Sequence, residues 1–113
     1  MDTQLLTAYL RFGIKHPGVF DTKTGYGVAH ASFRLYLQQL PDKGADCQEL
    51  RISRLTADEQ KMEPVKTLIE RLILLCREQK YTLSVYTGST DQSPFWQERG
   101  FVSNQTGVLT YSP

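Results

Sequence analysis

The sequence lacks the features that mark several large classes of protein. No apolar run reaches the roughly 18 residues that a membrane-spanning helix needs, and the N-terminus has no basic segment followed by an apolar one, as a signal peptide has. The 113 residues include only two cysteines, Cys47 and Cys76, which make neither a disulfide scaffold nor a metal cluster. We therefore expect a cytoplasmic protein that does not contact membranes and holds no metal.

An excess of charge of one sign is also missing. Thirteen Lys and Arg residues stand against twelve Asp and Glu residues, which leaves a net charge of +1. Nucleic acid is not an expected partner, because dedicated nucleic-acid binders carry a strongly basic surface. What the sequence does contain is 40% apolar residues, enough to fill one core, over a length that suits one domain spanning residues 1–113.

Hydrophobic periodicity in the first half predicts a helix followed by strands. Helical spacing of leucines predicts a helix over residues 3–12. The stretch after it, rich in glycine and proline, is predicted to be mostly loop, with a brief strand near residues 18–21 and a flexible turn at residues 25–27. Alternating apolar residues then predict two antiparallel strands, at residues 33–38 and 50–54.

The second half carries the strongest periodic signal. Apolar residues at positions i, i+3, i+4 and i+7 predict a long, largely buried helix over residues 63–80. A strand is predicted at residues 81–87, a short helix at 94–99, and further strands from residue 101 and over 107–111. Because a long helix joins two of these strands, we expect an α/β (α+β) fold with a mixed sheet.

Three segments of this second half resemble the GCN5-related N-acetyltransferase (GNAT) family. The sequence PFWQERGFV at residues 94–102 is similar to the family's aromatic-x-x-x-Gly-Phe signature. YTLSVYTGST, residues 81–90, is similar to its fifth strand and the following loop, and residues 50–75 correspond to its fourth strand, pyrophosphate-binding turn and long helix. The resemblance covers residues 33–111. It implies a mixed, mainly antiparallel sheet with the long helix packed on one face, and a reduced first half.

The resemblance also implies a place for coenzyme A. In the family, its pyrophosphate rests on backbone N–H groups at the start of the long helix, after a Gln/Arg-x-x-Gly-x-Gly/Ala loop. Here Gln60 keeps the first position, but neither glycine is present, Glu63 adds a negative charge and Pro64 removes one N–H group. The sequence leaves two possibilities for the cofactor, which are acetyl-CoA and none. The candidate cofactor-binding residues are Leu55, Thr56, Gln60, Lys61, Met62, Val65 and Lys66.

The residues implied for proton transfer also differ from the family pattern. The position of a frequent general-acid tyrosine is occupied by Trp96, whose N–H cannot act as an acid near neutral pH. The position of a frequent asparagine is Ser89, and Tyr86 is a substitute proton donor, so these two are the candidate catalytic residues. Phe95 and Trp96 are adjacent on a short helix. One of the two rings is expected to face away from the core and to form a partner-binding surface.

Two functions follow from these residues. The first is a small, non-catalytic acetyltransferase-like domain that binds another protein or a second copy of itself. The alternative is an acetyl-CoA-dependent N-acetyltransferase with an atypical pyrophosphate loop. The missing glycines and the tryptophan favour the first function, and titration with acetyl-CoA separates the two.

Overall fold

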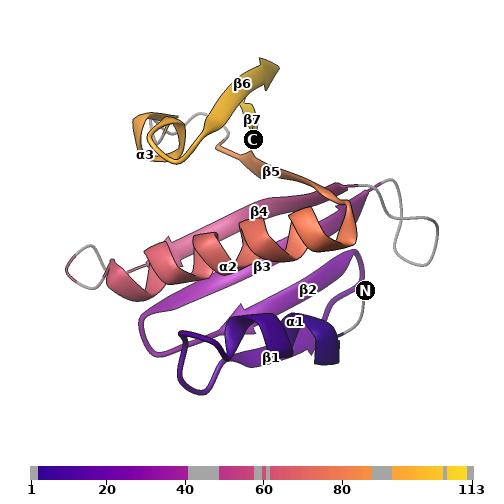
Figure 1. The fold of residues 1–113 in the computed structure, drawn as a ribbon, viewed down its shortest axis with the longest axis vertical. Helices are drawn as coiled ribbons and strands as arrows, with labels where there is room; N and C mark the ends of the chain where they lie inside the picture. Colours follow the sequence, from indigo (N-terminus) through magenta and orange to yellow (C-terminus); the bar gives the residue numbers. More distant parts are fainter. Residues whose placement is uncertain are drawn as a thin grey trace.

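The structure, a computed structural model, describes residues 3–40, 49–57, 60, 62–87, 93–105 and 107–111, except for the side chains of residues 93, 104 and 105. Within these residues, seven strands form one sheet in the order β1-β2-β3-β4-β5-β7-β6 (Figure 1). The helices are α1 (Thr3–Leu10), α2 (Glu63–Gln79) and α3 (Ser93–Gln97). The strands are β1 (Gly18–Asp21), β2 (Gly25–Ala29), β3 (Phe33–Leu40), β4 (Glu49–Ala57), β5 (Thr82–Tyr86), β6 (Phe101–Gln105) and β7 (Val108–Tyr111).

The sheet is mixed and mainly antiparallel, as predicted. The described strand pairs are antiparallel except for β4 and β5, which are parallel. Helix α2 connects these two parallel strands, which is the connection that the periodicity of residues 63–80 indicated. The predicted helix is confirmed to within one residue. It ends where Lys80 takes a left-handed conformation, with φ of 62°, and donates its N–H to the carbonyl of Cys76.

The three described helices cover one face of the sheet. Leu6 of α1, Leu68 of α2 and Trp96 of α3 belong to one hydrophobic cluster, together with Leu35 of β3. Figure 1 shows α1 and α2 side by side on this face. Arg71 of α2 joins the two helices, since its Nε donates a hydrogen bond of 2.8 Å to the carbonyl of residue 9 in α1. The opposite face carries no helix among the described residues, and no described helix is long and apolar enough to cross a membrane.

Strand β2 corrects the prediction of a loop at residues 25–27. It is a buried strand that pairs with both β1 and β3. A Cβ atom at Gly25 would overlap the carbonyl oxygen of Leu37, and one at Gly27 would overlap the ring of Phe20. The two glycines are therefore explained by close packing within a sheet, and not by the flexibility of a turn.

The hairpin of β3 and β4 is confirmed, and both strands are longer than predicted. Tyr36 pairs with Arg54, but Leu37 pairs with Ile52, so Ser53 is an additional residue on β4 that forms a β-bulge. The bulge lies in the middle of the strand. It divides β4 into a first half, Glu49–Ile52, that pairs with both β3 and β5, and a second half that pairs only with β3 among the described strands.

A polar network on the helix-free face joins β4 to β5. The Ser84 hydroxyl is fully buried and donates to a carboxylate oxygen of Glu49 at 2.8 Å. It also accepts a hydrogen bond of 3.3 Å from Nε of Arg51, whose guanidinium forms an ion pair of 2.9 Å with Glu49. The buried hydroxyl is thus satisfied, and the parallel pair is fixed at this point.

Candidate functional site

The first part of the candidate site is the place where β4 and β5 part. The two strands pair over Glu49–Ile52 and Thr82–Val85. Beyond Ile52, β4 continues to Ala57 and pairs only with β3 among the described strands. Figure 1 shows β5 diverging from β4. The backbone of residues 53–57 therefore has no strand partner on its β5 side, within the part of the chain that the structure describes, and an extended ligand can bond to it.

The second part is the start of α2. Met62 at the N-cap makes no side-chain capping hydrogen bond, and the N–H of Lys66 is the one bonded to the Met62 carbonyl. The first turn therefore leaves the N–H groups of Glu63 and Val65 without intrahelical partners, while Pro64 has none to offer. These two donors and the positive end of the helix dipole attract an anion.

The charge of Glu63 does not block this helix start. Its side chain is 89% exposed and forms an ion pair of 3.4 Å with Lys66 on the next turn. The carboxylate therefore lies in solvent and is partly balanced by a cation. The electrostatic penalty that the Glu63 carboxylate imposes on a bound anion is therefore smaller than a buried carboxylate at the same position would impose.

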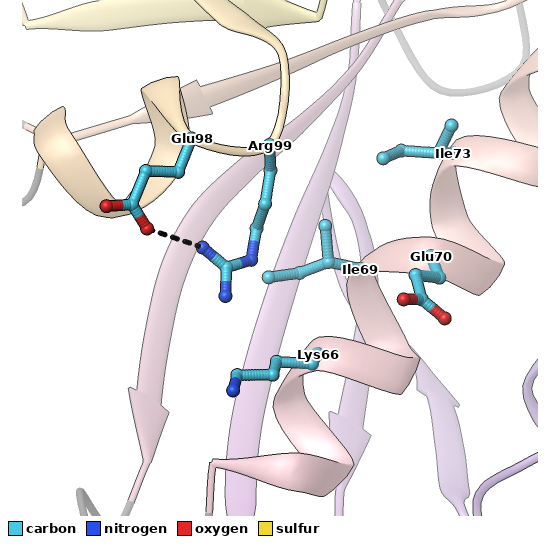
Figure 2. Close-up of a pocket in the computed structure, with 6 residues that line it drawn as sticks. All are labelled: Lys66, Ile69, Glu70, Ile73, Glu98 and Arg99. Atoms are coloured by element: carbon cyan, nitrogen blue, oxygen red, sulfur yellow. Dashed lines mark ion pairs between the residues drawn. The ribbon is translucent and has the colours of Figure 1, made fainter.

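The third part is a cavity of about 400 Å³ between α2 and the end of α3. Figure 2 shows Arg99 reaching from the α3 side toward Ile69 and Lys66 on α2. The Arg99 guanidinium stacks 3.9 Å from the centre of the Phe95 ring and donates to the Phe95 carbonyl at 2.7 Å. It is thereby held at the mouth of the cavity. The cavity is lined by Lys66, Ile69, Glu70, Ile73, Glu98 and Arg99.

The predicted cofactor-binding residues divide by burial. Val65 is fully buried and can offer only its backbone to a ligand, whereas Leu55 and Met62 are partly buried against the core. Thr56 and Gln60 are exposed. Lys66 is exposed and lines the cavity. Lys61 lies outside the described residues.

Of the two predicted catalytic residues, the structure describes Tyr86. Tyr86 is the last residue of β5, at the place where the strands part, and its side chain is 54% exposed. Tyr86 thus lies one residue beyond the last β5 residue that pairs with β4. Ser89 lies outside the described residues.

The prediction that Phe95 or Trp96 faces away from the core is wrong. Trp96 is 1% exposed, with the rings of Phe95 and Phe101 at centroid distances of 5.2 Å. Its buried Nε1 has no hydrogen-bond partner among the described residues. Phe95 packs partly against the core and is covered by Arg99. Their role in partner binding stays a prediction, without the exposed ring on which it depended.

Sequence reasoning missed Arg99 and Glu98. Both follow α3 directly and line the cavity, and Arg99 lies four residues after Phe95, the spacing at which side chains on a helical turn meet. An arginine directly before the Gly-Phe pair was the available signal. Among the described residues, no group of three His, Cys, Asp or Glu side chains converges on a possible metal position.

Comparison with known proteins gives matches only among solved structures. No protein-family model matches the sequence, and no curated protein matches it. A GNAT family acetyltransferase from Elizabethkingia anophelis, solved with acetyl-CoA bound, aligns with 99% of this chain and 84% of its own at a TM-score of 0.54 and 15% identity. Naa50 of Arabidopsis thaliana, solved in complex with the bisubstrate analogue CoA-Ac-MVNAL, aligns with 97% of this chain and 91% of its own at 0.50 and 9% identity.

The arrangement of strands and helices is therefore that of an acetyltransferase-like α/β domain. More specifically, the chain has the fold of the GNAT acetyltransferases. The likeness extends over nearly the whole chain, beyond the residues 33–111 for which the sequence indicated it.

Proposed function

We propose that this protein binds acetyl-CoA and transfers its acetyl group to an amine. The observation that carries the proposal is the parting of β4 from β5 at Ser53, in a sheet whose α2 helix begins without a side-chain cap. An acetyltransferase fold alone does not decide function, because unrelated functions share folds. The edge of β4 without a described partner, the start of α2 without a side-chain cap and the Arg99 side chain at the cavity mouth are features of this chain's own residues.

Each part of the site suits one part of acetyl-CoA. The N–H groups of Glu63 and Val65, together with the cation of Lys66, would hold the pyrophosphate. Arg99, across the cavity from Lys66, would supply a second cation by exchanging its ion pair of 3.9 Å with Glu98 for the pyrophosphate. The backbone of residues 53–57 would bond the amide groups of the pantetheine arm, much as a neighbouring strand would. Pro64 leaves one donor fewer than a glycine loop would give, so we expect weaker binding than a complete loop provides.

The transfer itself needs little from the protein beyond positioning. The lone pair of a neutral amine attacks the thioester carbonyl carbon, a C–N bond forms, and the C–S bond breaks to release a thiolate. The thiolate takes up one proton and the nitrogen loses one. Tyr86 is the described hydroxyl placed at the strand opening, and it would donate the proton to sulfur. Trp96 cannot do so, because its N–H is buried in the core.

Isothermal titration calorimetry with acetyl-CoA tests the proposal. We expect saturable binding, weakened about tenfold in Lys66→Ala, since a charge-assisted hydrogen bond to phosphate contributes about 1.5 kcal/mol. Lys15→Ala is the matched control, an exposed lysine that lines none of the cavities described here, and it should bind as the parent does. No heat at millimolar acetyl-CoA would refute the proposal.

A non-catalytic function is the second candidate, and two observations favour it. Pro64 removes a donor from the helix start, and Trp96 replaces a general acid with a buried ring. In that case the protein would bind another protein or a second copy of itself. A flat titration together with a dimeric mass in size-exclusion chromatography would support this candidate over the enzyme. The cytoplasmic location expected from the sequence stays a prediction.

A further inference from the structure

A second cavity, of about 390 Å³, opens on the sheet face that carries no described helix. Tyr36 and Arg54 are paired across β3 and β4, and both line it. The neighbouring Leu35 and Leu37 are buried in the core, so the side chains of Tyr36 and Arg54 point to the opposite face. The cavity, named here the acceptor pocket, is lined by Thr22, Lys23, Thr24, Tyr36, Leu37, Ser53 and Arg54.

The turn between β1 and β2 forms one wall of the acceptor pocket, and hydrogen bonds fix its conformation. The N–H of Thr22 bonds to the Gly25 carbonyl, and the Gly25 N–H bonds to the Thr22 hydroxyl, each at 3.0 Å. The carbonyl of Thr24 accepts a hydrogen bond of 2.9 Å from the N–H of Gln39 in β3. Lys23, in the middle of this turn, therefore belongs to a segment whose backbone is held by hydrogen bonds on both sides of it.

The charges that line the acceptor pocket are all positive. Lys23 and Arg54 are its ionisable lining residues apart from the Tyr36 phenol, and neither forms an ion pair with a described residue. Arg51, further along β4, differs because Glu49 neutralises it. Two cations without an ion pair to a described residue, beside the Tyr36 phenol, suit a carboxylate or a phosphate, while the Ser53 hydroxyl donates to the Tyr36 carbonyl at 3.2 Å.

The position of the acceptor pocket links it to the proposed acetyl transfer. Ser53 lines it and is also the bulge residue at which β4 leaves β5. A thioester held between the strands would therefore lie beside this pocket. Resting on the proposed function, we infer that the acetyl acceptor is a small amine that also carries a carboxylate or phosphate, bound by Lys23 and Arg54.

The inferred reaction is balanced without any further reagent. The acceptor's neutral amine attacks the thioester carbonyl carbon, the C–S bond breaks as the C–N bond forms, and one proton passes from nitrogen to sulfur. The products are an N-acetyl amine that keeps its anionic group, and coenzyme A as the thiol. The anion takes no part in the bond changes; it holds the amine in place.

Matched amines test the inference in a thiol-release assay with acetyl-CoA. The pair 4-aminobutyrate and butylamine differs in a carboxylate, and the pair phosphoethanolamine and ethanolamine differs in a phosphate. We expect at least one anionic amine to exceed its neutral counterpart about tenfold or more in kcat/KM, and the favoured pair identifies the anion. Equal rates within both pairs, from an enzyme that turns over, would overturn the inference.

Variants show whether the acceptor pocket causes the preference. Arg54→Gln and Lys23→Gln should each reduce the preference severalfold, and Lys23→Gln, which lies outside the strand edge proposed to bind acetyl-CoA, should leave the affinity for acetyl-CoA unchanged. Arg34→Gln is the control, because this exposed arginine lies on the same face but does not line the pocket. A preference that survives both pocket substitutions would overturn the assignment.

A direct binding measurement separates this inference from the proposed function. Titration of the ¹⁵N-labelled protein with 4-aminobutyrate and with phosphoethanolamine, without acetyl-CoA, should shift the amides of residues 22–24 and 53–54. If acetyl-CoA does not bind but these shifts occur, the anion site stands and the acetyltransferase proposal fails. If acetyl-CoA binds and no such shift or rate preference is found, the inference fails and the proposed function stands.

Discussion

Replacing Trp96 by alanine should destabilise the protein strongly. The indole is 1% exposed and has the rings of Phe95 and Phe101 at 5.2 Å. Truncating a buried tryptophan costs about 3–5 kcal/mol, because both transfer energy and packing are lost. Small domains are stable by only about 5–15 kcal/mol. At about 4 °C per kcal/mol, the midpoint of thermal unfolding should fall by about 12–20 °C.

A second variant at the same position isolates the indole N–H. Trp96→Phe keeps an aromatic ring but removes the buried N–H that has no described partner. Removing an unsatisfied buried donor recovers about 1–3 kcal/mol, which offsets the loss of ring volume. We therefore expect Trp96→Phe to cost less than half as much as Trp96→Ala.

The assays are thermal and urea unfolding, both followed by far-ultraviolet circular dichroism, since the variants remove the one tryptophan that fluorescence would report. Val102→Ala is the control, an exposed apolar side chain in the adjoining strand β6, and it should change stability by less than about 0.5 kcal/mol. If Trp96→Ala were as mild as Val102→Ala, the burial argument would be refuted. If the parent protein were then a dimer and Trp96→Ala a monomer, the predicted partner-binding role of Trp96 would be supported.

Three further predictions concern the sheet and the start of α2. Glu49→Gln should cost about 1.5–3 kcal/mol in urea unfolding, because it weakens hydrogen bonds to a charged group and leaves Arg51 without its counterion. Gly25→Ala should cost about 1–3 kcal/mol in thermal unfolding, because its Cβ would overlap the Leu37 carbonyl and separate β2 from β3. Pro64→Ala adds one N–H at the helix start, so acetyl-CoA should bind about fivefold more tightly by calorimetry, for a gain of about 1 kcal/mol.

Each of these predictions has a result that contradicts it. Glu63→Gln is the comparison for Glu49→Gln, because its carboxylate is almost wholly in solvent, and equal effects would refute the importance of the Glu49 network. Unchanged stability in Gly25→Ala would show that β2 can move away from β3 without cost. Unchanged or weaker acetyl-CoA binding in Pro64→Ala would show that the helix start does not hold the phosphates.

The elements with a strong period were predictable from the sequence. The stripe that includes Val65, Leu68 and Leu72 gave α2 to within one residue, because this spacing repeats over the full length of the helix. The alternation at Phe33, Leu35 and Leu37 likewise predicted β3, since each of these residues points into the core. In both elements many side chains are buried on one face, so the apolar pattern repeats often enough to be recognised in the sequence.

Strand β2 was not predictable in the same way. Gly25 and Gly27 indicate a turn when the sequence is read locally, and the reason for them lies on other strands, in the Leu37 carbonyl and the Phe20 ring. The candidate site shows the same limit. The role of Arg99 depends on how close the segment after α3 lies to α2 in space, which no local pattern contains.

The parallel ladder between β4 and β5 has a mechanical consequence. Strands β1 to β4 form one antiparallel unit, β5, β7 and β6 form another, and the paired residues Glu49–Ile52 and Thr82–Val85 are the described backbone seam between them. The Ser84 network is the described polar contact that holds this short seam closed. We expect Ser84→Ala, which removes that contact, to make amides of the seam exchange with solvent water before those at the centre of either unit. A molecule bound across the opening would slow this exchange and make the two units unfold together.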